Sequence, residues 1–358
     1  MRICIVLGTR PEIIKMSPII RLCSKLNLEH FVVHTGQHYS YGMDKVFFEE
    51  LELPNPKYNL EVGSGSHGFQ TARIIEGVEL VFLSERPDIV MVEGDTNTVL
   101  ASALAASKLH LKVGHVEAGL RSYDREMPEE VNRVLVDHIS DFLFCPTEKT
   151  AGIARSEGIS KNKIFVTGNT IVDAVQQNIV LARKKSDVMN RFGLSEGSYM
   201  LATIHREENV DNKTRMMNVL VGLDMVAVQY NLQVVFPVHP RTRKMVEQFK
   251  LKVPKTIMLM EPLGYFDFLM LESGAKLILT DSGGLQEEAC ILQVPCVTLR
   301  ENTERPETVE VGSNIIAGTA PAQILSSAEK MVGKKGWSNP LGDGKTSQKI
   351  IEIVCREL

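Results

Sequence analysis

Residues 276–289 of this chain read KLILTDSGGLQEEA, and this stretch indicates the fold. The apolar run at 277–279 is typical of a short buried strand. Residues 281–284 end that strand, and the residues from Leu285 onward have the pattern of a helix with acidic residues in its first turn. A strand, a tight turn and a helix N-terminus therefore follow one another, as in the repeating unit of a parallel α/β sheet.

The turn between this strand and this helix is suited to an anion. The first N–H groups of a helix lack partners, and Gly283 and Gly284 allow a ligand to approach the backbone closely. Glu287 and Glu288 follow at once, and a carboxylate there suits hydroxyl groups such as those of a ribose. An ordinary strand–helix turn explains the stretch slightly better when it is taken alone. An anion beside a diol nevertheless suggests a nucleotide, and the rest of the chain decides between the two interpretations.

The composition predicts a soluble globular protein with room for two domains. The chain has 358 residues, of which 44% are hydrophobic and 23% charged. A net charge of −4 argues against general affinity for nucleic acids or anionic membranes. We expect no signal peptide and no membrane-spanning segment. The six cysteines form no CxxC pair, so we expect free thiols in the reducing cytoplasm and no zinc or other metal site.

Strand–helix units repeat in two halves of the sequence. Apolar runs such as 2–7, 88–92 and 112–116 predict parallel strands in the first half, and the pattern restarts at 199–203. We place the domain boundary at 168/169 and expect loops at 54–65 and 300–307. The predicted fold class is therefore α/β, with two Rossmann-like domains and a cleft between them.

Several polar residues directly follow predicted strands, where ligands of parallel sheets bind. These residues are Arg10, Asp95, Glu117, His205, His239 and Ser282. One such residue would mean little, since many of these loops carry helix caps, and Asp95 could simply cap the helix that follows it. Glu129, at a helix start, would also be structural if taken alone. The chain has neither a GxGxxG dinucleotide fingerprint nor a phosphate-binding P-loop.

Six motifs together resemble those of the non-hydrolysing UDP-N-acetylglucosamine 2-epimerases. They lie in that family's order over most of the chain, at residues 8–12, 93–96, 115–121, 128–133, 280–288 and 303–307. The resemblance implies a fold similar to GT-B glycosyltransferases. It also implies a first domain of residues 1–168, a UDP-binding domain of 169–344, and a final helix at 345–358 that returns to the first domain.

The resemblance also implies roles for individual residues. Asp95, Glu117, Glu129 and His205 are the implied catalytic residues. The implied substrate-binding residues are Arg10, Lys15, Phe268, Ser282, Gly283, Gly284, Glu288 and Arg305. Among them, Glu288 matches the residue on the ribose and Phe268 the aromatic residue near the uracil.

The implied reaction is reversible C2 epimerisation of UDP-N-acetylglucosamine, without metal or NAD. UDP leaves C1 as the C2 hydrogen is lost, which forms a 2-acetamidoglucal, and UDP then adds back after C2 is reprotonated on the other face. The sequence does not assign the acid and base roles among the carboxylates. Two alternatives stay open: a GT-B glycosyltransferase that uses a UDP-sugar donor, and a non-catalytic UDP-sugar sensor.

Many bacterial members of the family bind a second, regulatory UDP-N-acetylglucosamine. The resemblance places Gln37, Arg73, Arg206 and His239 near such an allosteric pocket. Glu207 departs from the family pattern, in which many members have a second arginine, and its charge weakens the local positive field. We further expect a cytoplasmic homodimer that serves polysaccharide biosynthesis.

Overall fold

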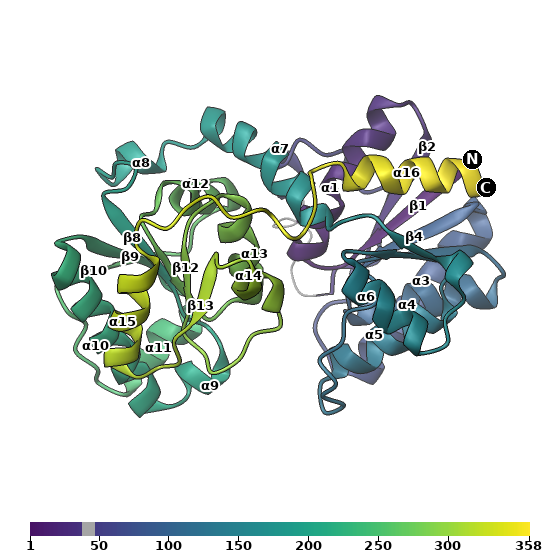
Figure 1. Ribbon diagram of the computed structural model, residues 1–358. Helices are drawn as coiled ribbons and strands as arrows, with labels where there is room; N and C mark the ends of the chain where they lie inside the picture. Colours follow the sequence, from purple (N-terminus) through teal and green to yellow (C-terminus); the bar gives the residue numbers. More distant parts are fainter. Residues whose placement is uncertain (38–46) are drawn as a thin grey trace. The chain divides into compact units, whose positions relative to one another are not determined.

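The computed structural model describes residues 1–37 and 47–358, which divide into two compact units (Figure 1). The first unit comprises Met1–Gln177 and Leu341–Leu358, and the second comprises Asn178–Pro340. The division falls inside helix α7 (Thr170–Lys185), beyond the boundary placed at 168/169. The first unit extends this far because Asp173, in α7, accepts hydrogen bonds from the start of the final helix.

The first unit contains a parallel sheet whose strands are near-continuous apolar runs. Within the described residues its order is β3-β2-β1-β4-β5-β6-β7. The strands are β1 (Arg2–Leu7), β2 (Glu29–His34), β3 (Tyr58–Asn59), β4 (Ile89–Glu93), β5 (Lys112–Val116), β6 (Phe142–Cys145) and β7 (Ile164–Val166). Residues 3–7 of β1 are fully buried, as expected for a strand covered on both faces.

The helices of the first unit connect and cover these strands. They are α1 (Arg10–Lys25), α3 (His67–Glu85), α4 (Asn97–Lys108), α5 (Pro128–Ile139), α6 (Glu148–Ser156), the first part of α7, and α16 (Thr346–Glu357), with a 3-10 turn η1 (Lys161–Lys163). Four alanines of α4 pack into a core with the valines of β4, because small side chains let a helix approach a sheet closely. Figure 1 shows α16 beside α1, where its apolar face is buried.

The second unit repeats the same architecture. Its parallel sheet has the order β10-β9-β8-β11-β12-β13. The strands are β8 (Tyr199–Thr203), β9 (Gln233–Pro237), β10 (Ile257–Met260), β11 (Ile278–Thr280), β12 (Cys296–Thr298) and β13 (Asn314–Ile316). Tyr199 and Leu201 belong to one apolar cluster, whereas Met200 and Ala202 belong to another. Alternate residues of a strand point to opposite faces, so both faces of this sheet are buried.

The helices of the second unit include three short ones that the sequence analysis did not predict. All of them are α8 (Val188–Arg191), α9 (Glu207–Val210), α10 (Lys213–Tyr230), α11 (Pro240–Gln248), α12 (Tyr265–Gly274), α13 (Gly283–Ile291), α14 (Pro306–Glu310) and α15 (Pro321–Met331), together with the end of α7. The predicted loop at 300–307 was wrong at its end, because Pro306 begins α14. The loop at 54–65 was also wrong in part, since it contains β3.

The strand order of each sheet reverses at one point. In the first unit β1 lies between β2 and β4, and in the second unit β8 lies between β9 and β11. Chain connections leave such a strand pair in opposite directions, and ligands of open α/β sheets bind in the crevice outside this point. The predicted α/β class with two Rossmann-like sheets is therefore confirmed. In the described part of the chain, no helix is long and apolar enough to span a membrane.

Candidate active site

The turns after β1 and β4 meet at the reversal point of the first sheet, and Glu12 joins them. Its Oε2 atom accepts from the backbone N–H of Gly8 at 2.5 Å and of Thr9 at 3.2 Å. Its Oε1 atom accepts from the hydroxyl of Thr96, in the turn after β4, at 2.6 Å. Gly8 cannot carry a side chain here, because a Cβ atom would lie 2.0 Å from Thr98 Oγ1.

Lys15, one turn into α1, lies between two carboxylates. Its Nζ atom is 2.5 Å from Glu117 Oε2 and 3.1 Å from Glu93 Oε1. Asn169 Nδ2 donates to the same oxygen of Glu117 at 3.0 Å. Glu117 also adopts φ = +67°, a left-handed conformation that costs energy outside glycine and is concentrated at functional sites. The resemblance assigned Lys15 to phosphates, whereas this structure directs its ammonium group to the carboxylate cluster.

Burial tunes the carboxyl groups of this cluster. Burial raises the pKa of Glu12 to about 7, although Thr96, Gly8 and Thr9 donate hydrogen bonds to it. Burial also raises the pKa of Glu93 well above its usual range; Lys15 opposes this shift, and the charges of Glu117 and Glu12 add to it. A carboxyl group with a pKa near 7 exchanges protons at neutral pH, which suits acid–base chemistry.

Helix α5 orients Asp95, the residue that follows Gly94 in the turn after β4. Arg133 donates to Asp95 Oδ2 through Nε at 2.9 Å and through Nη2 at 2.5 Å. Asn132 Nδ2 donates to the backbone carbonyl of Asp95 at 2.8 Å. The side chain and the backbone of Asp95 are thus both fixed by one helix.

The first turn of α5 carries two glutamates with different surroundings. Glu130 is buried and accepts from the backbone N–H groups of Ser122 at 2.8 Å and Tyr123 at 3.0 Å. Burial raises the pKa of Glu130, but these donors and Arg133 outweigh it and hold the pKa below its usual value. Glu130 therefore fixes the loop before the helix. Glu129, the predicted catalytic residue, lies on a half-buried face of the same turn.

In the second unit, Asp281 joins the two turns at the reversal point. This fully buried carboxylate accepts from the backbone N–H of His205 at 3.0 Å and of Arg206 at 3.0 Å, and from Asn209 Nδ2 at 3.0 Å. His205 Nδ1 lies 3.1 Å from Asp281 Oδ1. Burial raises the pKa of Asp281, but His205 and Asn209 outweigh burial and lower it overall. Asp281 thereby orients the His205 ring, whose side chain is 44% exposed.

The N-terminus of α13 is open, as an anion site requires. Ser282 is its N-cap residue, and Gly283 and Gly284 form its first two positions. A Cβ atom at Gly284 would meet nothing within 4 Å, and one at Gly283 would meet only Glu304 Oε2, at 3.6 Å. The Ser282 side chain does not cap this helix, and among the described residues there is space beside Gly284, so its N-terminus suits the binding of a phosphate group.

The remaining predicted residues of the second unit lie on or near the same helix. Glu288 is half-buried on α13, and Phe268 is half-buried on α12. Burial, and then the neighbouring Glu288 carboxyl, raise the pKa of the fully buried Glu272 well above its usual range. Arg305 lies 2.7 Å from Glu287, one residue before Glu288.

Arg10 and the four residues assigned to the allosteric pocket have varied surroundings. The guanidinium group of Arg10, at the start of α1, stacks over the Phe47 ring at 5.6 Å.

Among the residues assigned to the allosteric pocket, Gln37 is buried, and its side-chain carbonyl accepts from Thr98. Arg73 is exposed on α3, Arg206 precedes α9, and the His239 ring accepts from the N–H of Arg241. Arg241 also pairs with Glu207, the residue that departs from the family pattern.

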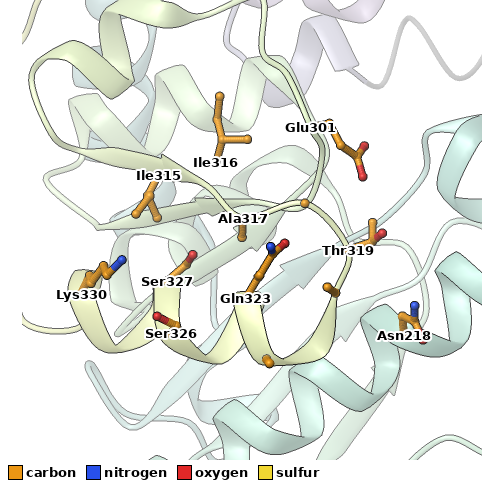
Figure 2. A pocket seen from close by; sticks show the side chains of 13 residues that line it. Asn218, Glu301, Ile315, Ile316, Ala317, Thr319, Gln323, Ser326, Ser327 and Lys330 are labelled. Atoms are coloured by element: carbon orange, nitrogen blue, oxygen red, sulfur yellow. The ribbon is translucent and has the colours of Figure 1, made fainter.

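A separate cavity of about 640 Å³ lies beside β13, the edge strand of the second sheet (Figure 2). Thr319, Gln323 and Ser327 surround it together with Glu301 and Lys330, and no predicted site residue lines it. In the described residues, no group of three His, Cys, Asp or Glu side chains is arranged to hold a metal ion.

The sequence analysis missed the residues that hold the predicted ones in place. Glu12, Glu93, Asn132, Arg133, Asn169, Asn209 and Asp281 form this set. Glu12 carried a signal, because Thr9 and Glu12 have the spacing of a capping box. Glu93, Asn132, Arg133 and Asp281 lie within the motifs of the resemblance, whereas Asn169 and Asn209 carried no signal, since tertiary contacts alone bring them to their partners.

Comparisons with known proteins show the family to which the chain belongs. The family model described as UDP-N-acetylglucosamine 2-epimerase matches residues 21–355. The chain is 56% identical to the UDP-N-acetylglucosamine 2-epimerase of Methanocaldococcus jannaschii and 55% identical to that of Methanococcus maripaludis, over 99% of each chain in both cases. A crystal structure of the Methanocaldococcus jannaschii enzyme in complex with UDP-GlcNAc and UDP superimposes with a TM-score of 0.88, at 56% identity, and covers 99% of this chain and 100% of that one. The chain belongs to the UDP-N-acetylglucosamine 2-epimerase family.

Proposed function

We propose that this protein interconverts UDP-N-acetylglucosamine and UDP-N-acetylmannosamine by inverting C2 of the sugar. The observation that carries the proposal is the 56% identity over 99% of the chain to an enzyme of that name. The carboxylates gathered in the first unit would provide the acid–base groups that this reaction needs, and the helix N-terminus at Gly283 and Gly284 in the second would provide the anion site.

The proposed chemistry is elimination followed by re-addition. The C1–O bond breaks and its electron pair leaves with UDP, while the C2 proton passes to a carboxylate. The 2-acetamidoglucal then takes a proton at C2 on the opposite face, and a UDP oxygen re-forms the bond to C1. Because the proton leaves one face of the sugar and is added on the other, the reaction requires two acid–base groups. Our candidates are Asp95, Glu117 and Glu129.

The leaving diphosphate carries growing negative charge. His205, Arg10 and the N–H groups at Gly283 and Gly284 would stabilise it where that charge develops. Glu288 would accept from the ribose hydroxyls, and Phe268 would contact the uracil. Arg305, paired with Glu287, would fix the end of α13 that carries Glu288.

A proton NMR time course with UDP-N-acetylglucosamine in D2O tests the proposal. We expect UDP-N-acetylmannosamine to appear with deuterium at C2, because the proton lost from C2 exchanges with solvent. The reaction should proceed without added NAD and in the presence of EDTA. Net release of UDP with a free sugar would indicate hydrolysis, whereas binding without turnover would indicate a sensor.

We also propose regulation by a second molecule of UDP-N-acetylglucosamine, involving Gln37, Arg73, Arg206 and His239. Support comes from Arg73, which is exposed on α3 among the described residues. Against it, Gln37 already accepts a hydrogen bond from Thr98. A sigmoidal dependence of initial rate on substrate, made hyperbolic by Arg73→Ala, is the expected result. A hyperbolic wild-type curve would remove the second site.

A homodimer is our proposal for the assembly. Leu80 and Leu83 on α3 and Leu135 on α5 are exposed apolar side chains that a partner subunit would cover. Light scattering after size exclusion should give about twice the chain mass of 39.9 kDa. A cytoplasmic location and a place in polysaccharide biosynthesis stay predictions from the sequence.

A further inference from the structure

A buried histidine lies directly behind the candidate carboxylates of the first unit. His115, in β5, is 1% exposed. Its Nδ1 atom lies 2.7 Å from Asp137 Oδ1, and its Nε2 atom lies 2.8 Å from the backbone carbonyl oxygen of Gly94. Both ring nitrogens therefore face oxygen atoms at hydrogen-bonding distance.

The hydrogens of this arrangement can be counted. The carbonyl oxygen of Gly94 only accepts, so His115 Nε2 must carry a hydrogen. A neutral imidazole has one N–H group, and Nδ1 would then point a lone pair at Asp137 Oδ1 across 2.7 Å. A second hydrogen must lie between these two atoms.

Asp137 does not supply that hydrogen. Asp137 is held in its ionised form by the adjacent guanidinium group of Arg121. Its Oδ2 atom lies 2.7 Å from Arg121 Nη1 and accepts from the backbone N–H of Gly119 at 3.1 Å. Arg121 in turn pairs with Glu157 at 2.6 Å. When both ring nitrogens of His115 are protonated, the positive charges of His115 and Arg121 balance the negative charges of Asp137 and Glu157.

This network reaches every element that carries a candidate carboxylate in the first unit. Gly94 directly precedes Asp95, and Gly119 follows Glu117 by two residues. Asp137 lies on α5, the helix whose first turn bears Glu129 and whose Asn132 and Arg133 hold Asp95.

We propose that His115 is a buried imidazolium and a positioning residue that fixes Asp95, Glu117 and Glu129 relative to one another. It touches no substrate itself and acts through the turns after β4 and β5. Its catalytic part rests on the proposed function, whereas its protonation and its hold on the two turns do not. Displacing reacting groups by about 1 Å can cost two orders of magnitude in rate, so the effect should be visible in turnover.

Long-range proton–nitrogen NMR of the full-length protein, with nitrogen-labelled histidine, tests the protonation directly. The chain has nine histidines, and the signal missing from His115→Gln identifies His115. At pH 7 we expect both ring nitrogens of His115 to carry a hydrogen. One protonated and one bare nitrogen would overturn the proposal.

Hydrogen exchange and kinetics test the positioning role. In His115→Gln, which keeps a donor for Gly94 but loses the charge and the second donor, amides at 94–95 and 117–119 should exchange faster. Turnover should fall about 10- to 100-fold with little change in KM. His30→Gln is the matched control, because His30 lies in β2 and its ring bonds the carbonyl of Leu28 and the hydroxyl of Ser24 in the described part of the chain.

A folded His115→Gln variant with wild-type exchange and kcat would overturn the positioning role. If wild-type protein does not epimerise UDP-N-acetylglucosamine at all, the proposed function fails. The NMR and exchange results would still decide the role of His115 in that case.

Discussion

At the scale of single residues, each unit joins two turns through one buried carboxylate, but the pKa of that carboxylate shifts in opposite directions in the two units. A buried carboxylate joins the paired turns in each sheet: Glu12 in the first unit and Asp281 in the second. Burial raises the pKa of Glu12 to about 7, whereas burial of Asp281 is outweighed by His205 and Asn209, so that the pKa of Asp281 falls. Glu12 can therefore exchange protons near neutral pH, whereas Asp281 holds the His205 ring in place.

Glu12 should make stability depend on pH. Its pKa rises from 4.5 to about 7 on folding, so between these values the folded state binds more protons than the unfolded state. Stability contributed by this group must therefore fall as pH rises from 4.5 to 7, by about 3 kcal/mol in total. Glu12→Gln should lose this dependence.

Urea unfolding followed by circular dichroism, for wild type and Glu12→Gln across this pH range, measures the effect. Glu79→Gln, an exposed glutamate on α3, is the control and should follow the wild type. Parallel curves for wild type and Glu12→Gln would contradict the prediction.

The candidate carboxylates should act on turnover more than on binding. Asp95→Asn, Glu117→Gln and Glu129→Gln keep size but remove the proton acceptor, so kcat should fall about 100-fold or more in each. Glu76→Gln, an exposed position on α3, should leave kcat unchanged. Near-normal turnover in all three variants would show that these groups are structural caps.

At the scale of elements, the sequence predicts long structure well and short structure poorly. The buried apolar runs at 2–7, 112–116 and 199–203 match β1, β5 and β8, because a continuous apolar run in a strand–helix repeat has few other solutions. Strands β3 and β13 have two and three residues, which is too few to show an alternating pattern in the sequence. Their pairing with neighbouring strands at the sheet edges determines that they form strands.

The same limit applies to the site. Polar residues that follow strands, such as Asp95 and Ser282, can be predicted because parallel strands place such residues on one rim. The side chains that contact these residues cannot be predicted in the same way. Lys15 reads as a phosphate ligand in sequence, and only the fold brings Glu93 and Glu117 to its ammonium group.

The open N-terminus of α13 gives a prediction at this scale. Gly284→Ala adds a methyl group to free space, so the free protein should fold with equal or slightly higher stability. The methyl group would occupy the place of a bound phosphate, and the affinity for UDP should fall about tenfold or more, since one lost charge-assisted hydrogen bond contributes about 1.5–3 kcal/mol. Calorimetric titration with UDP measures this.

Gly152→Ala is the matched control for this experiment. Gly152 lies in α6, and a Cβ atom there also meets nothing within 4 Å. Unchanged UDP affinity in Gly284→Ala would place the diphosphate elsewhere.

At the scale of the whole molecule, the two ends of the chain build one unit. After completing the second unit, the chain returns at Leu341, and α16 packs on α1 with Ile350, Ile351 and Val354 buried. The first unit therefore cannot be completed until α16 has been synthesised, whereas the second unit is continuous in sequence.

Asp173 binds the start of α16 to the first unit. Its carboxylate accepts from the backbone N–H of Thr346 at 3.1 Å, and from the N–H and hydroxyl of Ser347 at 2.9 and 2.7 Å. Asp173→Ala leaves these buried donors without their acceptor, which should destabilise the first unit by about 2 kcal/mol or more. The second unit should be unaffected.

Fluorescence of the single tryptophan distinguishes unfolding of the second unit from unfolding of the first. Trp337 lies in the second unit, where its indole N–H donates to the carbonyl of Cys290, so its fluorescence follows that unit alone. In Asp173→Ala, circular dichroism should show an earlier unfolding step while the fluorescence transition stays at the wild-type temperature. Asp187→Ala, an exposed N-cap position before α8, should change neither. An equal shift of both signals in Asp173→Ala would mean that the units unfold together, and that the return of the chain stabilises the molecule as a whole.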